Sequence, residues 1–208
     1  GTVTFENATT ATDQNPDISV DTAGLYTVEL AATNSVGSDT ETKTDYIDAF
    51  VALLSESFEG TFPPTGWTAV DNGTTGNVWD RNDALGGINR TNGTGYSAAA
   101  DSDALCTTAW DTTLTSPSVD LTTVSAATLT FESNFQDFAG SGDAWLDISI
   151  NGGSTWTNVF TWTTDYGPTS ENWDLTSYVG NNILLAWTYS DNGDGCAWYW
   201  HIDDVMVF

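Results

Sequence analysis

The sequence has almost no positive charge. Its 208 residues include only 3 Lys and Arg and 1 His, against 29 Asp and Glu, which gives a formal net charge of −26. Nucleic-acid binding needs clustered Lys and Arg to neutralise phosphates, and an anionic membrane surface attracts basic segments. The composition therefore excludes nucleic acid and an anionic lipid surface as partners.

Long apolar runs are also missing. No stretch approaches the ~18 consecutive apolar residues that a membrane-spanning helix requires, so we expect no membrane insertion. No signal peptide opens the chain at Gly1, which predicts a processed or trimmed start. With so few basic residues and acid-rich loops, we expect an extracellular or cell-surface protein whose signal peptide has been removed or lies outside this sequence.

Cysteine is scarce, with Cys106 and Cys196 as the two examples. In an extracellular protein this pair favours a disulfide that closes a long loop. The alternative is two buried free thiols, which behave as small apolar side chains.

Signals for catalysis are few. His201 is the one histidine, and a structural role is favoured because it lies between Trp200 and Ile202 in an apparent strand. The chain has no zinc-ligand spacing, no Gly-x-Ser-x-Gly elbow and no phosphate-binding loop. Carboxylate pairs of the glycosidase kind are expected by chance among 29 acids, and nothing distinguishes an acid from a nucleophile. We expect no enzyme.

What the chain does have is Trp, Thr, Asn and Gly, with 10 Trp and 19 Gly. This composition favours strands and tight turns. Short alternating segments predict strands, for example residues 144–150 with Ala144, Leu146, Ile148 and Ile150 inward, and residues 182–190 with Ile183, Leu185, Trp187 and Tyr189 inward. We predict an all-β protein, with a jelly-roll β-sandwich over residues 55–208 and a smaller immunoglobulin-like β unit over residues 1–50.

The last strand carries an interruption. Trp198, Trp200 and Ile202 share one face, but Val205 and Val207 join that face only if the alternation slips by one residue at Asp203 and Asp204. Such a slip predicts a β-bulge, and bulges often re-aim side chains near sites. Two carboxylates beside a buried strand need a cation, so we hypothesise bound Ca²⁺. The alternative is two solvated aspartates.

The first unit resembles the C-terminal half of a PKD domain. The matching text is Gln-Asn-Pro at 14–16, Ala-Gly-Leu-Tyr-Thr-Val-Glu-Leu at 23–30, Ala-Thr-Asn at 32–34, and residues 37–47. The N-terminal strands of that family and its Trp-Asp-Phe-Gly-Asp-Gly motif are absent. Half a sandwich exposes strand edges and an apolar face, so the missing strands come either from a longer protein or from another chain.

The second unit resembles the cleaved-adhesin family, whose jelly rolls are related in shape to MAM domains. The resemblance rests on Phe-Glu-Gly at 58–60, residues 64–67, 99–103 and 114–121, Asn-Gly-Gly-Ser-Thr-Trp at 151–156, Trp-Asp-Leu at 173–175 and residues 198–205. It implies a non-catalytic adhesion or ligand-binding unit, found beside PKD domains in secreted proteins of Bacteroidota and often holding calcium.

The resemblance also implies metal ligands. It places Glu59 and one of Asp203 and Asp204 at a calcium ion, and Glu56 joins them if the first and last strands of the jelly roll are neighbours. A second metal site is hypothesised over Asp71, Asp101 and Asp103, although a solvated acidic loop is favoured there. The loop at 191–195 lacks the spacing and the closing Glu of an EF-hand.

Two surface chemistries remain. Aromatic rings stack on sugars, and alternation places Trp145, Trp156, Trp162 and Tyr199 away from the core, although most Trp of a β-sandwich pack inside. Asn7, Asn72, Asn89 and Asn92 begin glycosylation sequons. The Bacteroidota resemblance adds O-glycans on Asp-Ser/Thr-x motifs, which match at Thr22 and Thr112.

The expected function is a calcium-stabilised, non-catalytic extracellular adhesion or structural module. The incomplete N-terminal unit suggests self-assembly into a surface fibre through strand complementation, with neighbouring copies or other surface proteins as partners. The alternative is a carbohydrate-binding accessory module of a secreted hydrolase, with a glycan as the partner.

Overall fold

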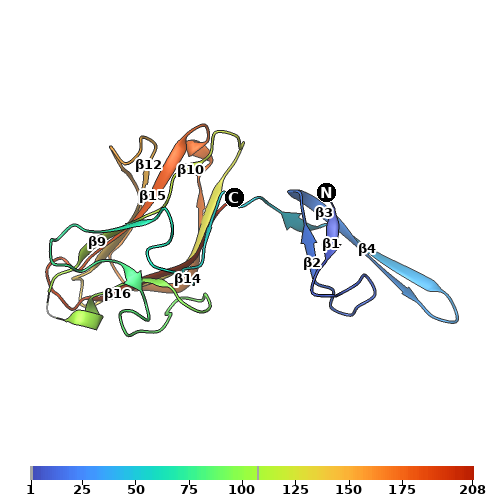
Figure 1. The fold of residues 1–208 in the computed structure, drawn as a ribbon, viewed down its shortest axis with the longest axis horizontal. Coiled ribbons are helices and arrows are strands. Elements are labelled where there is room, and N and C mark those ends of the chain that lie inside the picture. The colour runs from blue at the N-terminus through green and yellow to red at the C-terminus, as the bar shows by residue number, and fades with distance from the viewer. Residues whose placement is uncertain (1, 107) are drawn as a thin grey trace. The chain divides into compact units, whose positions relative to one another are not determined.

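The computed structural model describes residues 2–106 and 108–208. The chain divides into two compact units, Gly1–Ala52 and Leu53–Phe208 (Figure 1), and each is described by itself. No helix among the described residues has the length and apolar character needed to cross a membrane.

The first unit consists of two small antiparallel pairs. Strand β1 (Val3–Phe5) pairs with β2 (Ile18–Val20), and β3 (Gly24–Thr33) pairs with β4 (Ser38–Ala49). Between β3 and β4 the side chain of Asn34 closes the turn, because its Oδ1 accepts the backbone N–H groups of Val36 and Gly37. The β structure predicted over residues 1–50 is confirmed.

This unit has no hydrophobic core of its own. In its described part no hydrophobic side chain is buried, and Phe5 and Leu30 remain 41% and 68% exposed. Apolar side chains of both strand pairs instead line an open slot of about 260 Å³, among them Phe5, Val20 and Val28. The arrangement is that of half a sandwich, and the PKD resemblance itself stays a prediction.

The second unit is a β-sandwich of two antiparallel sheets of six strands each (Figure 1), as predicted. One sheet has the order β13-β12-β15-β9-β6, with β10 also on β15, and is called the groove sheet below. The other has the order β14-β11-β16-β8-β7, with β5 also on β16, and is called the bulge sheet. The strands are β5 (Leu54–Glu56), β6 (Thr68–Asp71), β7 (Asp80–Arg81), β8 (Ala98–Asp101), β9 (Asp111–Thr115), β10 (Val119–Asp120), β11 (Thr128–Asp137), β12 (Asp143–Ser149), β13 (Thr157–Trp162), β14 (Tyr166–Asp174), β15 (Asn182–Ser190) and β16 (Trp198–Val207), with short 3₁₀ turns η1 (Ser102–Leu105) and η2 (Thr176–Tyr178).

The core lies between these sheets and is rich in aromatic rings. Trp187 of β15 is fully buried, and its ring stacks on Trp67 and meets Phe131 edge-on, with centroids 5.7 Å apart in both pairs. The predicted inward stripe of β15 is confirmed. Ile150 was expected inward, but it is 52% exposed because β12 ends at Ser149 and Ile150 begins the following turn.

The interruption in the last strand is a β-bulge, as predicted. Glu132 of β11 lies opposite Asp203, and Thr130 lies opposite Met206, so the register shifts between them. Asp204 has a positive φ of 48° and points to solvent, while Ile202, Val205 and Val207 are buried together. The bulge thus lets the strand bury its apolar side chains on both sides of the two aspartates.

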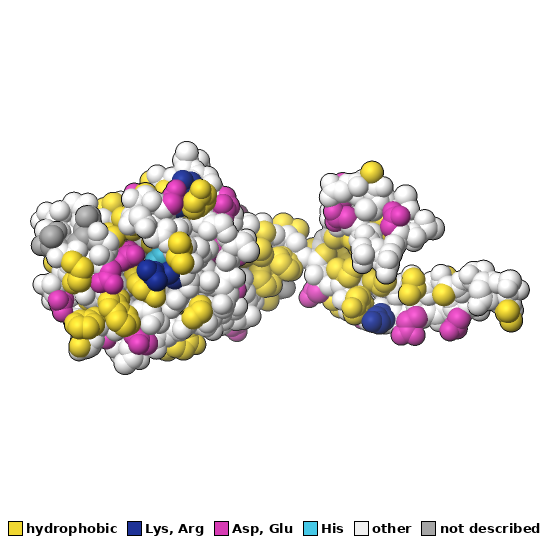
Figure 2. Space-filling view, turned by 90° about the horizontal axis from the view of Figure 1, so that it is seen from below, with side chains coloured by type: hydrophobic (Ala, Val, Ile, Leu, Met, Phe, Trp, Pro, Cys, Tyr) yellow, Lys and Arg dark blue, Asp and Glu magenta, His cyan; other side chains and the backbone are white. Residues whose placement is uncertain are grey.

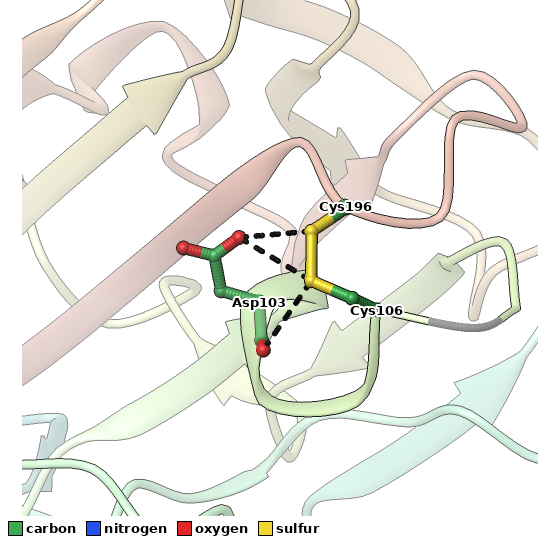
Figure 3. Close-up of side chains that lie close together, drawn as sticks. All are labelled: Asp103, Cys106 and Cys196. Carbon is green, nitrogen blue, oxygen red and sulfur yellow. Dashed lines mark hydrogen bonds between the residues drawn. A yellow bond between two sulfur atoms is a disulfide. The ribbon is translucent and has the colours of Figure 1, made fainter.

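Cys106 and Cys196 form a disulfide, which confirms the favoured interpretation. The bond joins the turn after η1 to the loop before β16, and the Asp103 carboxylate points at it (Figure 3), with Oδ1 3.3 Å from Cys196 Sγ. The two sulfurs are bonded to each other, so neither has a thiol hydrogen to donate and neither can ligate a metal as a thiolate. This cluster is therefore structural.

Candidate functional site

A groove of about 510 Å³ crosses the outer face of the groove sheet. Side chains on this face come from alternate residues of neighbouring strands. Trp145 of β12 lies opposite Thr188 of β15, Thr188 opposite Thr113 of β9, and Thr113 opposite Val70 of β6. These four residues make one row across the strands, which we call the tryptophan row.

Carboxylates flank the tryptophan row on both sides. Asp147 lies two residues beyond Trp145 on β12, in a row with Ala186 and Thr115. Asp111 lies two residues before Thr113 on β9, and its backbone oxygen accepts the N–H of Asn72. Small side chains such as those of Ala186 and Thr115 thus line the groove between the strands, and the carboxylates of Asp147 and Asp111 stand on its two sides.

Trp156 supplies a second aromatic ring to the groove. It follows the turn at residues 151–155 and is 40% exposed. The turn contains Gly152 and Gly153 at positive φ. At Gly153 a Cβ would lie 3.5 Å from Cζ2 of Trp156, which is an ordinary van der Waals contact, so the indole lies against this turn and it is the positive φ of 85° that favours glycine.

The polar side chains of the groove are held by one another. Asn72 Nδ2 donates to Asp111 Oδ1 and to Thr113 Oγ1, both at 3.0 Å. Asn158 Nδ2 donates to Asp147 Oδ1 at 2.9 Å, and the hydroxyls of Thr113 and Thr188 are 2.8 Å apart. These hydrogen bonds fix the side chains before any ligand arrives, which lowers the entropic cost of binding.

Of the four residues predicted to stack on sugars, two line the groove and two do not. Trp145 and Trp156 line the groove. Trp162 does not, and its assignment to the surface was wrong: it lies opposite Ala144, is 3% exposed, and packs on Trp200 in the core. Tyr199 lies on the other sheet, beneath the guanidinium of Arg90 at 4.5 Å.

Sequence reasoning missed the polar half of the groove. Asn72, Asp111, Thr113 and Thr188 were not singled out as binding residues. The signal available was the alternation of β9, where Asp111, Thr113 and Thr115 share the half-buried phase. What the alternation lacks is the order of the strands, which brings residues 70, 113, 145 and 188 into one row.

A second acidic site lies at the bulge. The Asp203 side chain is fully buried, and burial raises its pKa to about 7, with the charges of Asp204 and Glu59 adding to the shift. Asn89 Nδ2 donates to Asp203 Oδ2 at 2.8 Å, and the N–H of Tyr96 donates to Glu59 Oε1 at 2.8 Å. Both hydrogen bonds come from residues 89–96, which we call the glycine loop.

The glycine loop follows the two carboxylates closely. A Cβ at Gly93 would overlap the carboxylate of Asp203, and a Cβ at Gly95 would overlap that of Glu59. Gly95 also has a positive φ of 71°, which favours glycine. The sequence did not indicate that this loop covers Asp203 and Glu59, because residues 93 and 203 are brought together only by the fold.

The remaining predicted ligands, Glu56 and Asp204, lie on β5 and β16, which pair with each other and place Glu56 opposite Val205. Strand β5 ends at Glu56, so Glu59 lies in the loop after it. Glu56 Oε1 accepts the N–H of Phe58 at 2.7 Å, and Asp204 is exposed. Within the described residues these acids form no group of three with ligand atoms all within 4.8 Å of one another. The calcium ligand set therefore stays a prediction.

The other acidic candidates do not form a site. Asp71 ends β6 in the groove sheet and accepts the N–H of Gly76, whereas Asp101 ends β8 in the bulge sheet and accepts that of Ala104. Because Asp103 lies against the disulfide, the predicted cluster of these three acids is not brought together. Asp191 is buried and accepts the N–H groups of Gly193 and Gly195, so its loop is closed by its own backbone.

His201 has the structural surroundings expected of it. It is fully buried, and Ser97 Oγ lies 2.9 Å from its Nδ1. Burial lowers its pKa to about 3, and the nearby Arg90 charge acts in the same direction. The imidazole is neutral at physiological pH and does not reach the groove, which lies on the other sheet.

The predicted glycosylation residues differ in access. Asn7, Asn72 and Asn92 are exposed and Asn89 is half-buried, and the amide nitrogens of Asn7, Asn72 and Asn89 donate hydrogen bonds to aspartates. Thr22 is exposed and donates to Asp21. Thr112 was a wrong choice, because it is fully buried and its hydroxyl is bonded to the backbones of Val70 and Trp79.

The fold is similar to that of known β-sandwich domains. A cleaved adhesin domain of Lys-gingipain from Porphyromonas gingivalis is 24% identical, with a TM-score of 0.59 over 74% of this chain and 96% of that chain. A second cleaved adhesin domain of the same protein is 17% identical, with a TM-score of 0.49 over 76% of this chain and 99% of that chain. CBM27-1 of Caldicellulosiruptor saccharolyticus, solved in complex with mannohexaose, is 13% identical, with a TM-score of 0.48 over 76% of this chain and 97% of that chain. No family model matches the chain, and no curated protein matches it. At these identities the first likeness shows a shared fold.

Proposed function

We propose that this protein is a non-catalytic extracellular adhesion module whose second unit binds glycans in the groove. The observation that carries the proposal is the tryptophan row, where an indole and two threonine hydroxyls share one open face with Trp156 beside them. Sugars present an apolar ring face and a rim of hydroxyls, and this combination of aromatic and polar groups suits both.

The groove matches a short chain of sugar rings in length. From β12 to β6 the row crosses four neighbouring strands, and strands in a sheet lie about 4.8 Å apart, so it spans roughly 14 Å. That distance accommodates an oligosaccharide better than a single sugar. The length of the row therefore favours a groove that binds carbohydrate over a surface that adheres only to other proteins.

A binding role without catalysis is supported by where the unusual acids lie. Burial raises the pKa of Asp101, Glu171 and Asp203, but all three belong to the bulge sheet and none lines the groove. A glycosidase needs its protonated acid beside the bound sugar.

The test is binding to a glycan array, followed by titration calorimetry with the best oligosaccharide. Trp145→Ala and Trp156→Ala are each expected to weaken binding between about twofold and about tenfold, since one stacked ring contributes on the order of 0.5–1.5 kcal/mol beyond the area that it buries. Tyr199→Ala is the control, because this ring lies on the opposite sheet. Loss of binding in the control but not in Trp145→Ala would contradict the proposal.

Calcium at the bulge is the second part of the proposal. The residues fit a hard cation, since a fully buried carboxylate has no basic side chain within hydrogen-bonding reach in the described structure and a glycine loop lies against it. Asp203 and Glu59 would hold the ion, with carbonyl oxygens and waters completing the six to eight ligands that Ca²⁺ takes. The ion would neutralise the buried charge and tie the glycine loop to the last strand.

The measurement for calcium is the melting temperature with and without EDTA. We expect EDTA to lower it by several degrees in the wild type, and Asp203→Asn to remove this response. Asp39→Asn, in the exposed part of β4, is the matched control that keeps it. An unchanged wild-type melting temperature in EDTA contradicts this part and leaves the groove unaffected.

Self-association is the third part, and the first unit supports it. Its two strand pairs have open edges and an uncovered apolar slot. Such edges are completed by added strands, so we propose that another chain, in the simplest case a second copy, supplies them. Analytical ultracentrifugation tests this: a monomer at all concentrations, with the first unit ordered by NMR, rules it out.

A further inference from the structure

We propose that the groove acts as a charge filter: it admits uncharged glycan chains and rejects chains that carry carboxylate or sulfate groups. This inference rests on the proposed glycan binding and names the class of glycan. It follows from the position of two groove carboxylates, from their partners, and from the placement of every basic residue in the chain.

The two carboxylates stand on opposite sides of the tryptophan row. Asp147 is two residues from Trp145 along β12, and Asp111 is two residues from Thr113 along β9. Two residues of a strand span about 7 Å, so each acid lies roughly that far from the axis of a chain bound over the row. A bound glycan therefore has an acid on each side.

The hydrogen-bond partners of these acids carry no charge. Asp111 is bonded to the amide of Asn72, and Asp147 to the amide of Asn158. The second carboxylate oxygen of each has no protein partner among the described residues and remains open to a ligand. Sugar hydroxyls donate well to carboxylates, so the same atoms that bind an uncharged sugar repel an anionic one.

Basic side chains are placed elsewhere. Lys43 belongs to the first unit, Arg81 is paired with Asp83 at 2.6 Å, and Arg90 lies over Tyr199. Neither arginine lines the groove. Figure 2 shows acidic side chains scattered over the visible face and few basic ones, in keeping with the net charge of −26.

The distances make the repulsion effective. The Debye length is about 8 Å at physiological salt, so charges roughly 7 Å apart are only partly screened. Binding also removes water from the groove, which strengthens the interaction between like charges. Two such acids are expected to weaken binding of an anionic chain at least about tenfold, and high salt is expected to reduce this difference.

The experiment compares one chain in two charge states. The uncharged oligosaccharide that binds most tightly on the array is oxidised at C6, so that carboxylates replace its hydroxymethyl groups. Calorimetry at 50 mM and 500 mM NaCl then measures both forms against the wild-type protein. We expect the oxidised form to bind at least tenfold more weakly at the lower salt, and the gap to narrow at the higher.

Variants assign the effect to the groove. Asp111→Asn with Asp147→Asn is expected to raise the affinity for the oxidised form severalfold, with melting temperature as the check on folding. Glu29→Gln with Glu41→Gln, both exposed in the first unit, changes the net charge equally and should leave the gap unchanged. A gap that closes in this control would assign the repulsion to overall charge and overturn the inference.

The outcomes separate the filter from the proposed function. Equal or tighter binding of the oxidised form overturns the filter while glycan binding stands. A gap that persists unchanged at high salt and in the groove variant also overturns it, because the cause is then the shape of the sugar. Absence of binding to every uncharged chain, with Trp145→Ala indistinguishable from wild type, overturns both.

Discussion

The two units of this chain are built from the same kind of strand but differ in what the strands bury. In the second unit two sheets close over a core that includes Trp187 and Trp200, both fully buried. In the first unit β3 and β4 pair over ten and twelve residues, yet Leu30 on β3 remains 68% exposed. Backbone pairing alone therefore makes strands here, whereas a second sheet is what makes a core, since burial of apolar surface is the main stabilising force in folding.

The largest effect should come from separating the units. We expect residues 53–208 alone to show a cooperative thermal transition close to that of the full chain, and residues 1–52 alone to show none, because two-stranded sheets without a covered face are marginal in water. Circular dichroism on both fragments measures this. A cooperative transition in residues 1–52 would show that the first unit is complete by itself.

Within the whole chain, single substitutions in the two units should differ almost as clearly in their effect on the free energy of unfolding. Trp187→Ala removes a ring packed on Trp67 and Phe131 and should lower the free energy of unfolding of the second unit by about 3–5 kcal/mol. Leu30→Ala in the first unit should change it by less than about 0.5 kcal/mol. Urea titration followed by tryptophan fluorescence measures both, and similar losses would contradict the contrast.

The disulfide should rank next, because it belongs to the second unit alone. Cys106 and Cys196 are 90 residues apart, and their bond restricts the unfolded chain over that length. Replacing both with Ser should lower the free energy of unfolding by about 2–5 kcal/mol. Reduction of the wild-type protein with dithiothreitol should reproduce the shift. A shift in the double-serine variant alone would assign it to the serines, and no shift in either experiment would contradict the prediction.

The smallest effect concerns a buried acid. Burial raises the pKa of Glu171, whose Oε2 accepts the indole N–H of Trp173 and whose Oε1 has no partner in the described structure. A carboxyl with a raised pKa binds its proton more tightly when folded, so the contribution of Glu171 to stability is fully present at low pH and is lost as pH rises above the unfolded pKa near 4.5.

Glu171→Gln should remove the Glu171 contribution to that decline, while those of Asp101 and Asp203 remain, and should raise the free energy of unfolding at pH 8 by about 1 kcal/mol. Glu29→Gln, exposed on β3 of the first unit, is the charge-matched control and should have no such effect. Chemical denaturation at several pH values between 4 and 8 distinguishes the two variants. Parallel pH profiles for wild type and Glu171→Gln would contradict the prediction.

Much of this architecture could be read from local pattern. Period-2 alternation predicted the strands and the inward stripe of β15, and the slip at Asp203 and Asp204 predicted the bulge. Each of these depends on neighbours in sequence, because a strand places alternate residues on opposite faces. The prediction failed where a strand changes phase: the register of β13 shifts between its pairs with Leu146 and Asp147, so Trp162, expected outside, lies in the core.

The candidate site in the groove could not be predicted in the same way, because it depends on the order of strands in the groove sheet. Trp145, Thr188, Thr113 and Val70 are far apart in sequence and become one row only because β12, β15, β9 and β6 are neighbours. The same holds for Gly93 and Asp203. The sequence by itself determined strands, turns, net charge and the bulge, since these follow from local sterics and composition. Tertiary structure decided which side chains meet, because contacts across a sheet are set by strand pairing.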